Sequence, residues 1–135
     1  MRKDIIQINK NSNIAISTLW SKKEDIIKNL NDNIKQKIGI IGTTYTSYGI
    51  NLILETLAKN PKVDTLILFG ADLSSSGENL VKVFGKKDLN SIKILFPLEK
   101  IEKIVKTVKL IDLRKEFVNK NFNILEKTIE ENYNE

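Results

Sequence analysis

Cysteine and histidine are both absent from the 135 residues of this chain. Without cysteine the chain can form no disulfide, no thiolate metal site and no cysteine nucleophile, and its composition is compatible with a reducing cytosol. Without histidine, imidazole ligation of a metal and a serine-histidine catalytic triad are excluded as well. Any chemistry must therefore come from carboxylates, hydroxyls, amides and amines.

Long apolar runs are missing too. The longest are the length of a strand, far below the roughly 20 residues that span a bilayer, and the N-terminus lacks a signal-peptide core. We therefore expect a cytoplasmic protein without a membrane partner. The net charge of +5 comes mostly from lysines interleaved with acidic residues, which is typical of a solvated surface. For that reason we do not expect nucleic acid as a partner.

Apolar strands alternate with amphipathic helices, a pattern that predicts one domain over residues 1–135 with a mostly parallel central sheet. Helices on both faces would make it a three-layer α/β sandwich. The turn-forming residues 9–12 between strands 4–8 and 13–20 predict an N-terminal hairpin. The other expected elements are a helix over 22–35, a strand over 37–42, a helix with its apolar face over 50–57, a strand over 63–69, a helix over 77–84, a strand over 92–96, a helix with its apolar face over 101–108, a strand over 110–113 and a C-terminal helix over 115–132.

Helix ends and surfaces can be predicted in the same way. Ser21 with Glu24, and Ser75 with Glu78, have the three-residue spacing of a capping box. Trp20 follows a strand, and we expect it to be buried. We expect three lysines to form the solvent face of the helix whose apolar face covers 101–108: Lys100, Lys103 and Lys106.

Two polar loops follow strands of the predicted sheet, at residues 42–49 and 70–77. Ligands of α/β proteins bind outside the carboxyl ends of the strands, and the free amides of a helix N-terminus suit a phosphate or carboxylate. Turn and capping chemistry can explain the same residue types, and neither a Walker A loop nor a dinucleotide fingerprint is present. The predicted ligand-binding residues are Gly42, Thr43, Thr44, Thr46, Ser47, Gly70, Asp72, Ser74, Ser75, Ser76 and Gly77.

Asp72 is the one candidate catalytic residue in these loops. Its carboxylate could orient a ligand hydroxyl or act as a general base. Because the chain holds no histidine or cysteine to pair with it, the sequence assigns it no reaction, and no metal site is expected.

Short motifs along residues 13–113 resemble the soluble domain of the corrinoid-carrying subunit of tetrahydromethanopterin S-methyltransferase, from methanogenic archaea. The matching motifs, in chain order, are Thr18-Leu19-Trp20-Ser21, Gly49-Ile50, Asn60-Pro61, Leu66-Ile67-Leu68-Phe69-Gly70, Asp72, Ser76-Gly77, Pro97-Leu98-Glu99 and Leu110-Ile111-Asp112-Leu113. The resemblance implies a Rossmann-like fold. It also implies a corrinoid whose cobalt carries a methyl group and is bound by a histidine of the loop after the central strand.

The chain departs from this family at the decisive loop. Ser76 stands where the family has its cobalt-binding histidine, and a serine hydroxyl is a poor cobalt ligand. The family segment Thr-Glu-Asn-Leu-Gly-Ile is altered to Thr46-Ser47-Tyr48-Gly49-Ile50, and the expected C-terminal helix is too polar to be a membrane anchor. A corrinoid is thus implied by the resemblance and opposed by the missing histidine.

Three functions remain open from the sequence. The favoured one is a domain that binds an anionic or pterin-like small molecule of one-carbon metabolism at the two loops, without cobalt chemistry. The second is an accessory or regulatory subunit that docks on a one-carbon or methyl-transfer enzyme. The third is a small enzyme that uses Asp72.

Overall fold

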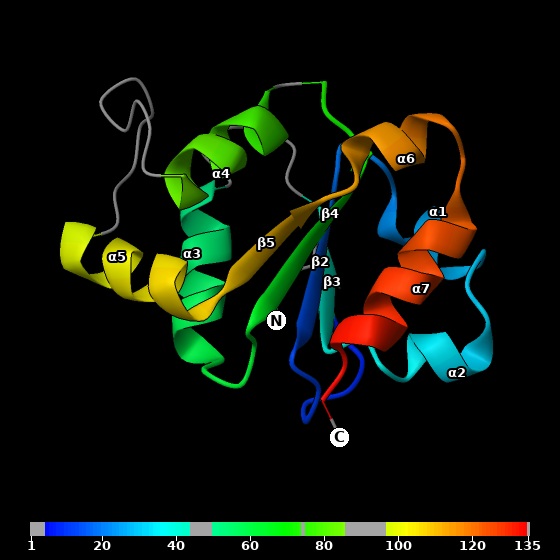
Figure 1. The fold of residues 1–135 in the computed structure, drawn as a ribbon, viewed down its shortest axis with the longest axis horizontal. Helices are drawn as coiled ribbons and strands as arrows, with labels where there is room; N and C mark the ends of the chain where they lie inside the picture. The colour runs from blue at the N-terminus through cyan, green and yellow to red at the C-terminus, as the bar shows by residue number, and fades with distance from the viewer. Residues whose placement is uncertain (1–4, 44–49, 74, 86–96, 135) are drawn as a thin grey trace.

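The computed structural model describes residues 5–43, 50–73, 75–85 and 97–134. These residues form a mixed α/β fold around one five-stranded sheet (Figure 1). The strands are β1 (Ile5–Gln7), β2 (Ile14–Leu19), β3 (Ile40–Gly42), β4 (Thr65–Ala71) and β5 (Lys109–Asp112). The helices are α1 (Lys23–Ile27), α2 (Asp32–Lys35), α3 (Ile50–Lys59), α4 (Ser76–Phe84), α5 (Leu98–Thr107), α6 (Arg114–Val118) and α7 (Phe122–Asn132).

The strand order is β1-β3-β2-β4-β5, in which β1 runs antiparallel to β3 and all other neighbours are parallel. All six residues of β2 are buried, and so are the first six of the seven residues of β4, as expected for strands covered on both faces. The mostly parallel sheet predicted from the sequence is confirmed, and so are the strand over 63–69 and the helices over 50–57 and 77–84.

The predicted N-terminal hairpin is wrong, because β3 lies between β1 and β2. The chain does turn after β1, where the Asn9 side chain accepts a hydrogen bond from the Asn11 amide. Strand β2, however, has both edges taken by its parallel neighbours β3 and β4. The three-residue β1 therefore pairs with the free edge of β3.

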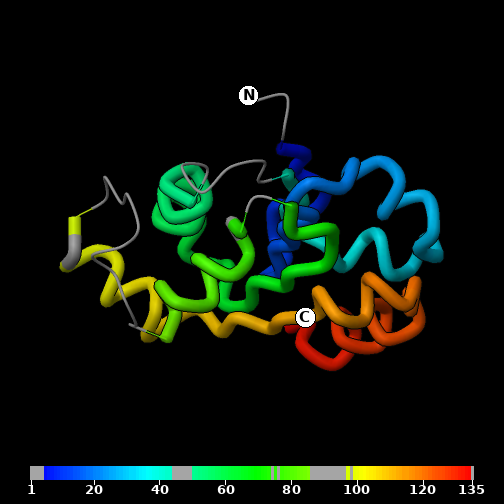
Figure 2. The backbone as a smooth tube through the Cα atoms, turned by 90° about the horizontal axis from the view of Figure 1, so that it is seen from above, coloured from blue at the N-terminus to red at the C-terminus, as the bar shows by residue number. Residues whose placement is uncertain are grey.

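Helices cover both faces of the sheet, over two separate apolar clusters. Helices α3, α4 and α5 pack on one face through residues such as Leu54, Leu80 and Ile104. The other face is covered by α1, α2, α6 and α7, with Ile26 and Leu125 among the buried residues. Figure 2 shows the strands passing between these two groups of helices. Among the described residues, no helix combines the length and apolar character that crossing a bilayer requires.

Two helices predicted as continuous are each broken by a turn that contains an asparagine cap. The helix expected over 22–35 divides into α1 and α2, where the Asn31 side chain accepts a hydrogen bond from the Ile34 amide at 2.9 Å. The helix expected over 115–132 divides into α6 and α7, where Lys120 has a φ of 56° and Asn121 caps α7. Short polar side chains of this kind compete for backbone amides and favour helix starts over helix interiors. The strand predicted over 92–96 lies outside the described residues.

Three side chains differ from their predicted roles. Trp20 is 41% exposed rather than buried. Ser21 does not cap α1, since its Oγ accepts a hydrogen bond from the Ala71 amide at 3.0 Å instead. Ser75 precedes α4 with a φ of 63° and makes no side-chain cap either. The predicted solvent face of α5 is confirmed at Lys100, Lys103 and Lys106.

Candidate functional site

The carboxyl ends of the four parallel strands meet at one edge of the sheet, at the top of Figure 1. Of the predicted ligand-binding residues, Gly42 ends β3 and Thr43 follows it, while Gly70, Asp72, Ser75, Ser76 and Gly77 belong to the β4 strand, its loop and the start of α4. Thr44, Thr46, Ser47 and Ser74 lie outside the described residues. Because β2 separates β3 from β4, the two loops start about 10 Å apart rather than from neighbouring strands.

Asp72 caps helix α4. Its carboxylate accepts hydrogen bonds from the backbone amides of Gly77 and Glu78, each at 3.0 Å. A third hydrogen bond comes from Arg114 Nη1 at 2.9 Å, and the Asp72 side chain is only 15% exposed. The amides at the start of α4, which the sequence predicts would bind an anionic ligand, therefore already bind a carboxylate of the chain itself.

Arg114 joins three carboxylates at this end of the sheet. It bonds Asp112 through Nη2 at 2.6 Å and through Nε at 2.8 Å, and it also contacts Glu78 and Asp72. The hydrogen bonds from Arg114 lower the pKa of Asp112, and they raise the pKa of the Arg114 guanidinium above its usual range. With three carboxylates around one guanidinium, the cluster carries an excess of negative charge, which opposes the binding of an anion.

Sequence reasoning missed Arg114, although a signal for it was present. It is one of two arginines in the chain, and it stands two residues after the end of β5, at the same sheet edge as Asp72. Arginine is the side chain best suited to bind two carboxylates at once.

The ends of β2 and β4 form the topological switch point of the sheet, since the helices after these neighbouring strands lie on opposite faces. Ligands often bind at such a point. Here the Trp20 amide donates a hydrogen bond to the Ala71 carbonyl at 2.9 Å, and Ser21 Oγ accepts one from the Ala71 amide at 3.0 Å. A Cβ on Gly70 would lie 1.9 Å from the Thr18 carbonyl oxygen, so the two strands touch without space between them.

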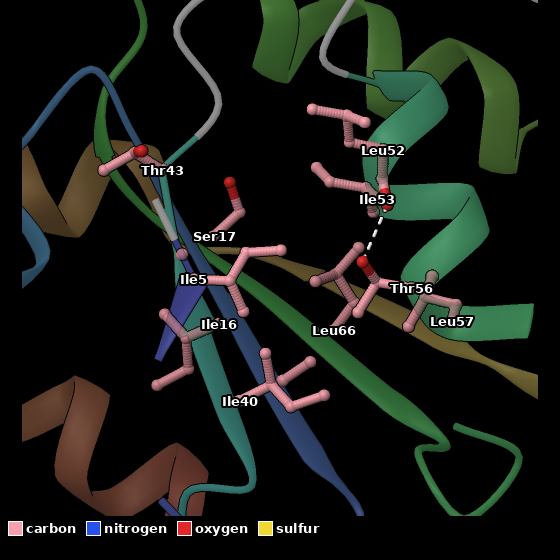
Figure 3. A pocket seen from close by; sticks show the side chains of 12 residues that line it. Ile5, Ile16, Ser17, Ile40, Thr43, Leu52, Ile53, Thr56, Leu57 and Leu66 are labelled. Atoms are coloured by element: carbon pink, nitrogen blue, oxygen red, sulfur yellow. Dashed lines mark hydrogen bonds between the residues drawn. The ribbon is translucent and has the colours of Figure 1, made fainter. Parts of the chain in front are cut away.

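A pocket lies instead between the sheet and α3 (Figure 3). Its origin is a patch of small side chains on the sheet face beneath this helix. Ser17 of β2 lies directly opposite Gly42 of β3, and Ala15 pairs with Ile40 in the same register. The resulting cavity has a volume of about 40 Å³. It is lined by Ile5, Ala15, Ile16, Ser17, Ile40, Gly42, Thr43, Leu52, Ile53, Thr56, Leu57 and Leu66.

Thr43 is the polar residue of this pocket whose hydrogen bonding is incomplete. It is 8% exposed, and among the described residues its Oγ1 is a buried side-chain atom without a hydrogen-bond partner. The hydroxyl of Thr56, on the opposite wall, donates to the Leu52 carbonyl at 2.8 Å, the bond drawn in Figure 3. Ser17 Oγ accepts a long hydrogen bond of 3.4 Å from the Leu19 amide.

No family model matches the chain, and no curated protein is significantly similar to it. The function must therefore be inferred from the residues of the chain itself. These offer two different environments at one sheet edge. Around Asp72 the polar groups are hydrogen-bonded to one another, whereas the pocket beneath α3 is lined mainly by aliphatic side chains.

Proposed function

We propose that the chain is a small-ligand-binding domain, and that part of its ligand enters the pocket between β2, β3 and α3. The observation that carries this proposal is the pocket itself, in which, among the described residues, aliphatic side chains of the sheet and α3 surround a few hydroxyl-bearing residues. Ligand sites in proteins share this combination of apolar lining and few polar groups.

Within this proposal, an uncharged, pterin-like ligand of one-carbon metabolism is favoured over an anionic one. None of the described residues that line the pocket is charged, and the N-terminus of α4 is capped by Asp72. We also propose that the fold is a three-layer, Rossmann-like sandwich related to the corrinoid-carrying subunit of the archaeal methyltransferase. The support is four parallel strands with helices on both faces and a switch point between β2 and β4.

The residues of the β4 loop do not fit a cobalt corrinoid held through a protein ligand. The chain has no histidine. There is also no free space beside Gly77, because a Cβ there would be 2.9 Å from Arg114 Cδ and 3.0 Å from Leu19 Cδ1. The Asp72 carboxylate already accepts hydrogen bonds from the amides of Gly77 and Glu78 at the start of α4. We therefore propose ligand binding without cobalt chemistry, in the cytoplasm.

A panel of pterins, folates, nucleotides and corrinoids tests the proposal by thermal shift. A ligand at 100 times its dissociation constant stabilises a protein by about 2.7 kcal/mol. For 135 residues that is a rise in melting temperature of roughly 9 °C. We expect a rise with uncharged pterins and none with nucleotides or corrinoids. Failure of every compound at millimolar concentration would refute the proposal.

The second function, that of a regulatory component of a larger enzyme, has one observation in its favour. Leu73 and Val118 are each 74% exposed, and Val118 lines a surface hollow together with Ala71 and Asp72, the residues that precede Leu73. Exposed apolar side chains that gather on one surface are typical of a protein contact. If this surface docks on an enzyme, the wild-type chain should retain a stoichiometric partner from a native lysate, and the double variant Leu73→Ser, Val118→Ser should lose it.

A further inference from the structure

We infer that a hollow at the amino edge of the sheet, opposite the edge that holds Asp72, binds a small organic anion with an apolar body. The hollow lies where the turn after β1 meets the turn after α3, at the lower edge of the sheet in Figure 1. Residues from the segments 7–12, 39–40 and 59–63 line it. The inference goes beyond the proposed function, since Ile40 is the one described residue that also lines the pocket beneath α3.

The hollow is large enough for the body of a small molecule. Its volume is about 200 Å³, which exceeds the ~150 Å³ of an apolar cavity that accommodates benzene. Ile40, Pro61 and Val63 supply apolar walls, and the methylene stems of the lining lysines can extend them. A single ring or a short branched chain therefore fits.

Three lysines line the hollow, and none of the described residues around it is acidic. Lys59 is paired with Glu55 at 2.8 Å. Lys62 Nζ contacts the neutral side chain of Asn11 at 3.4 Å, and Lys10 forms no ion pair with any described residue. Two of the three ammonium groups therefore lack an acidic partner within the described part of the chain.

Nearby negative groups do not cancel this charge. Asp64, two residues after Lys62, accepts hydrogen bonds from the side-chain amides of Asn13 and Asn134 at 2.7 and 3.2 Å. The C-terminus of α3 contributes about half a negative charge. The hollow thus keeps an excess of positive charge that an anionic group can neutralise, in contrast to the three carboxylates around Arg114 at the other edge.

The fold already uses neutral polar side chains of the hollow. Asn9 and Asn60 each donate a side-chain hydrogen bond to a backbone carbonyl, at 2.8 and 2.7 Å, and Ser12 Oγ donates one at 2.6 Å. A ligand that bonded to these groups would have to compete with contacts of the fold. The lysine ammonium groups are therefore best placed to select the ligand, and they select it by charge.

Benzoate, benzamide and acetate test the inference, because benzamide keeps the ring without the charge and acetate keeps the charge without the ring. Probes of this size bind weakly, with dissociation constants on the order of millimolar, so binding to the full chain is best followed by backbone amide chemical shifts. We expect benzoate to shift amides within 7–12 and 59–63. Its affinity should be at least roughly threefold above that of benzamide and tenfold above that of acetate. Added salt should weaken benzoate and leave benzamide unchanged.

Matched lysine variants locate the charge that matters. Lys10→Gln and Lys62→Gln keep most of the side-chain stem and remove the charge, and each should weaken benzoate by about twofold or more. Both side chains are exposed, so the melting temperature should stay near that of the wild type. Lys103→Gln is the control, because it makes the same change of charge on the exposed face of α5, outside the hollow, and it should leave the benzoate affinity unchanged.

Each other outcome would overturn the inference. Acetate that binds as tightly as benzoate at the same amides would indicate an adventitious ion only. Benzamide that binds as tightly as benzoate would remove the role of the lysines, and an equal loss in Lys103→Gln would reduce that role to the net charge of the protein. Absence of shifts in both segments at tens of millimolar benzoate would mean that the hollow binds no such anion. None of these results depends on the thermal-shift panel, so the inference and the proposed function can fail separately.

Discussion

Replacing Asp72 should destabilise the fold, whatever the protein does. The Asp72 carboxylate holds two amides of the first turn of α4 and the guanidinium of Arg114. Removing a cap costs about 1 kcal/mol, and a hydrogen bond to a charged group contributes about 1.5 to 3 kcal/mol. Arg114 retains Asp112 and Glu78, which limits the loss. We therefore expect Asp72→Ala to lower the free energy of unfolding by about 2 to 4 kcal/mol.

Chemical denaturation followed by circular dichroism measures this effect. An unfolding entropy of about 2.1 cal/mol/K per residue converts the expected loss to a fall in melting temperature of roughly 7 to 14 °C for 135 residues. Asp72→Asn keeps an oxygen for one of the two amides and should lose about 1 to 2 kcal/mol. Glu78→Gln is the control: its side chain is 53% exposed, and we expect a change below about 0.5 kcal/mol.

A double-mutant cycle then isolates the pair that Asp72 forms with Arg114. We expect Asp72→Ala and Arg114→Met to be coupled by about 1 to 2 kcal/mol, since the two side chains are 15% and 22% exposed and 2.9 Å apart. The reasoning is refuted if Asp72→Ala costs less than about 0.5 kcal/mol, because a carboxylate that contributes no stability is better explained by catalysis. Loss of turnover in Asp72→Asn can thus support the enzyme alternative only after the variant is shown to be folded.

Three further predictions follow from the same contacts. Thr43→Val should raise the free energy of unfolding by about 1 to 2 kcal/mol, because it removes a buried hydroxyl without a partner; an unchanged melting temperature would mean that the hydroxyl is bonded. Gly70→Ala should cost at least about 3 kcal/mol in a denaturant titration, since its Cβ would overlap the Thr18 carbonyl; a folded variant of wild-type stability would disprove that close approach. Asp112 has a pKa lowered by Arg114, so its contribution is present above its unfolded pKa of about 3.9 and is lost as the pH falls through the folded value. Unfolding measured from pH 3 to 7 should accordingly show a shallower acid limb in Asp112→Asn than in the wild type, and identical limbs would contradict the shift.

The apolar pattern of the sequence predicts the centre of the fold well. The continuous apolar run from Val63 to Phe69 predicts a strand buried on both faces, and the structure has β4 over Thr65–Ala71. Helix α3 is recognisable because Ile50, Leu54 and Leu57 repeat at the helical period. These segments are correct because burial dominates the choice of their conformation.

Local polar chemistry is predicted less well, because several partners compete for the same hydroxyl or carboxylate. Ser75 and Glu78 have the spacing of a capping box, yet the cap of α4 comes from Asp72. Ser21 likewise bonds to Ala71, which is 50 residues away in the chain. A tertiary partner of this kind leaves no periodic signal in the sequence.

The position of the candidate site was only half predictable. Thr43 belongs to the predicted set because it follows a strand in a polar loop. The pocket that it lines, however, depends on the register that places Ser17 opposite Gly42 and on the distance of α3 from that patch. Neither property can be read from spacing along the chain, because both arise only when the sheet and helix pack together.

The two halves of the predicted site therefore differ in what their polar groups do. In the β4 loop, Asp72 and Arg114 bond each other and the helix amides, so a ligand would have to compete with contacts that stabilise the fold. The pocket beneath α3 has no such network, since its described lining is mainly aliphatic, and a ligand group that enters it displaces no ion pair. A ligand bonded to Asp72 must first break another hydrogen bond. The difference favours the pocket beneath α3 over the β4 loop, although the loop carries more of the polar residues by which α/β sites are recognised in a sequence.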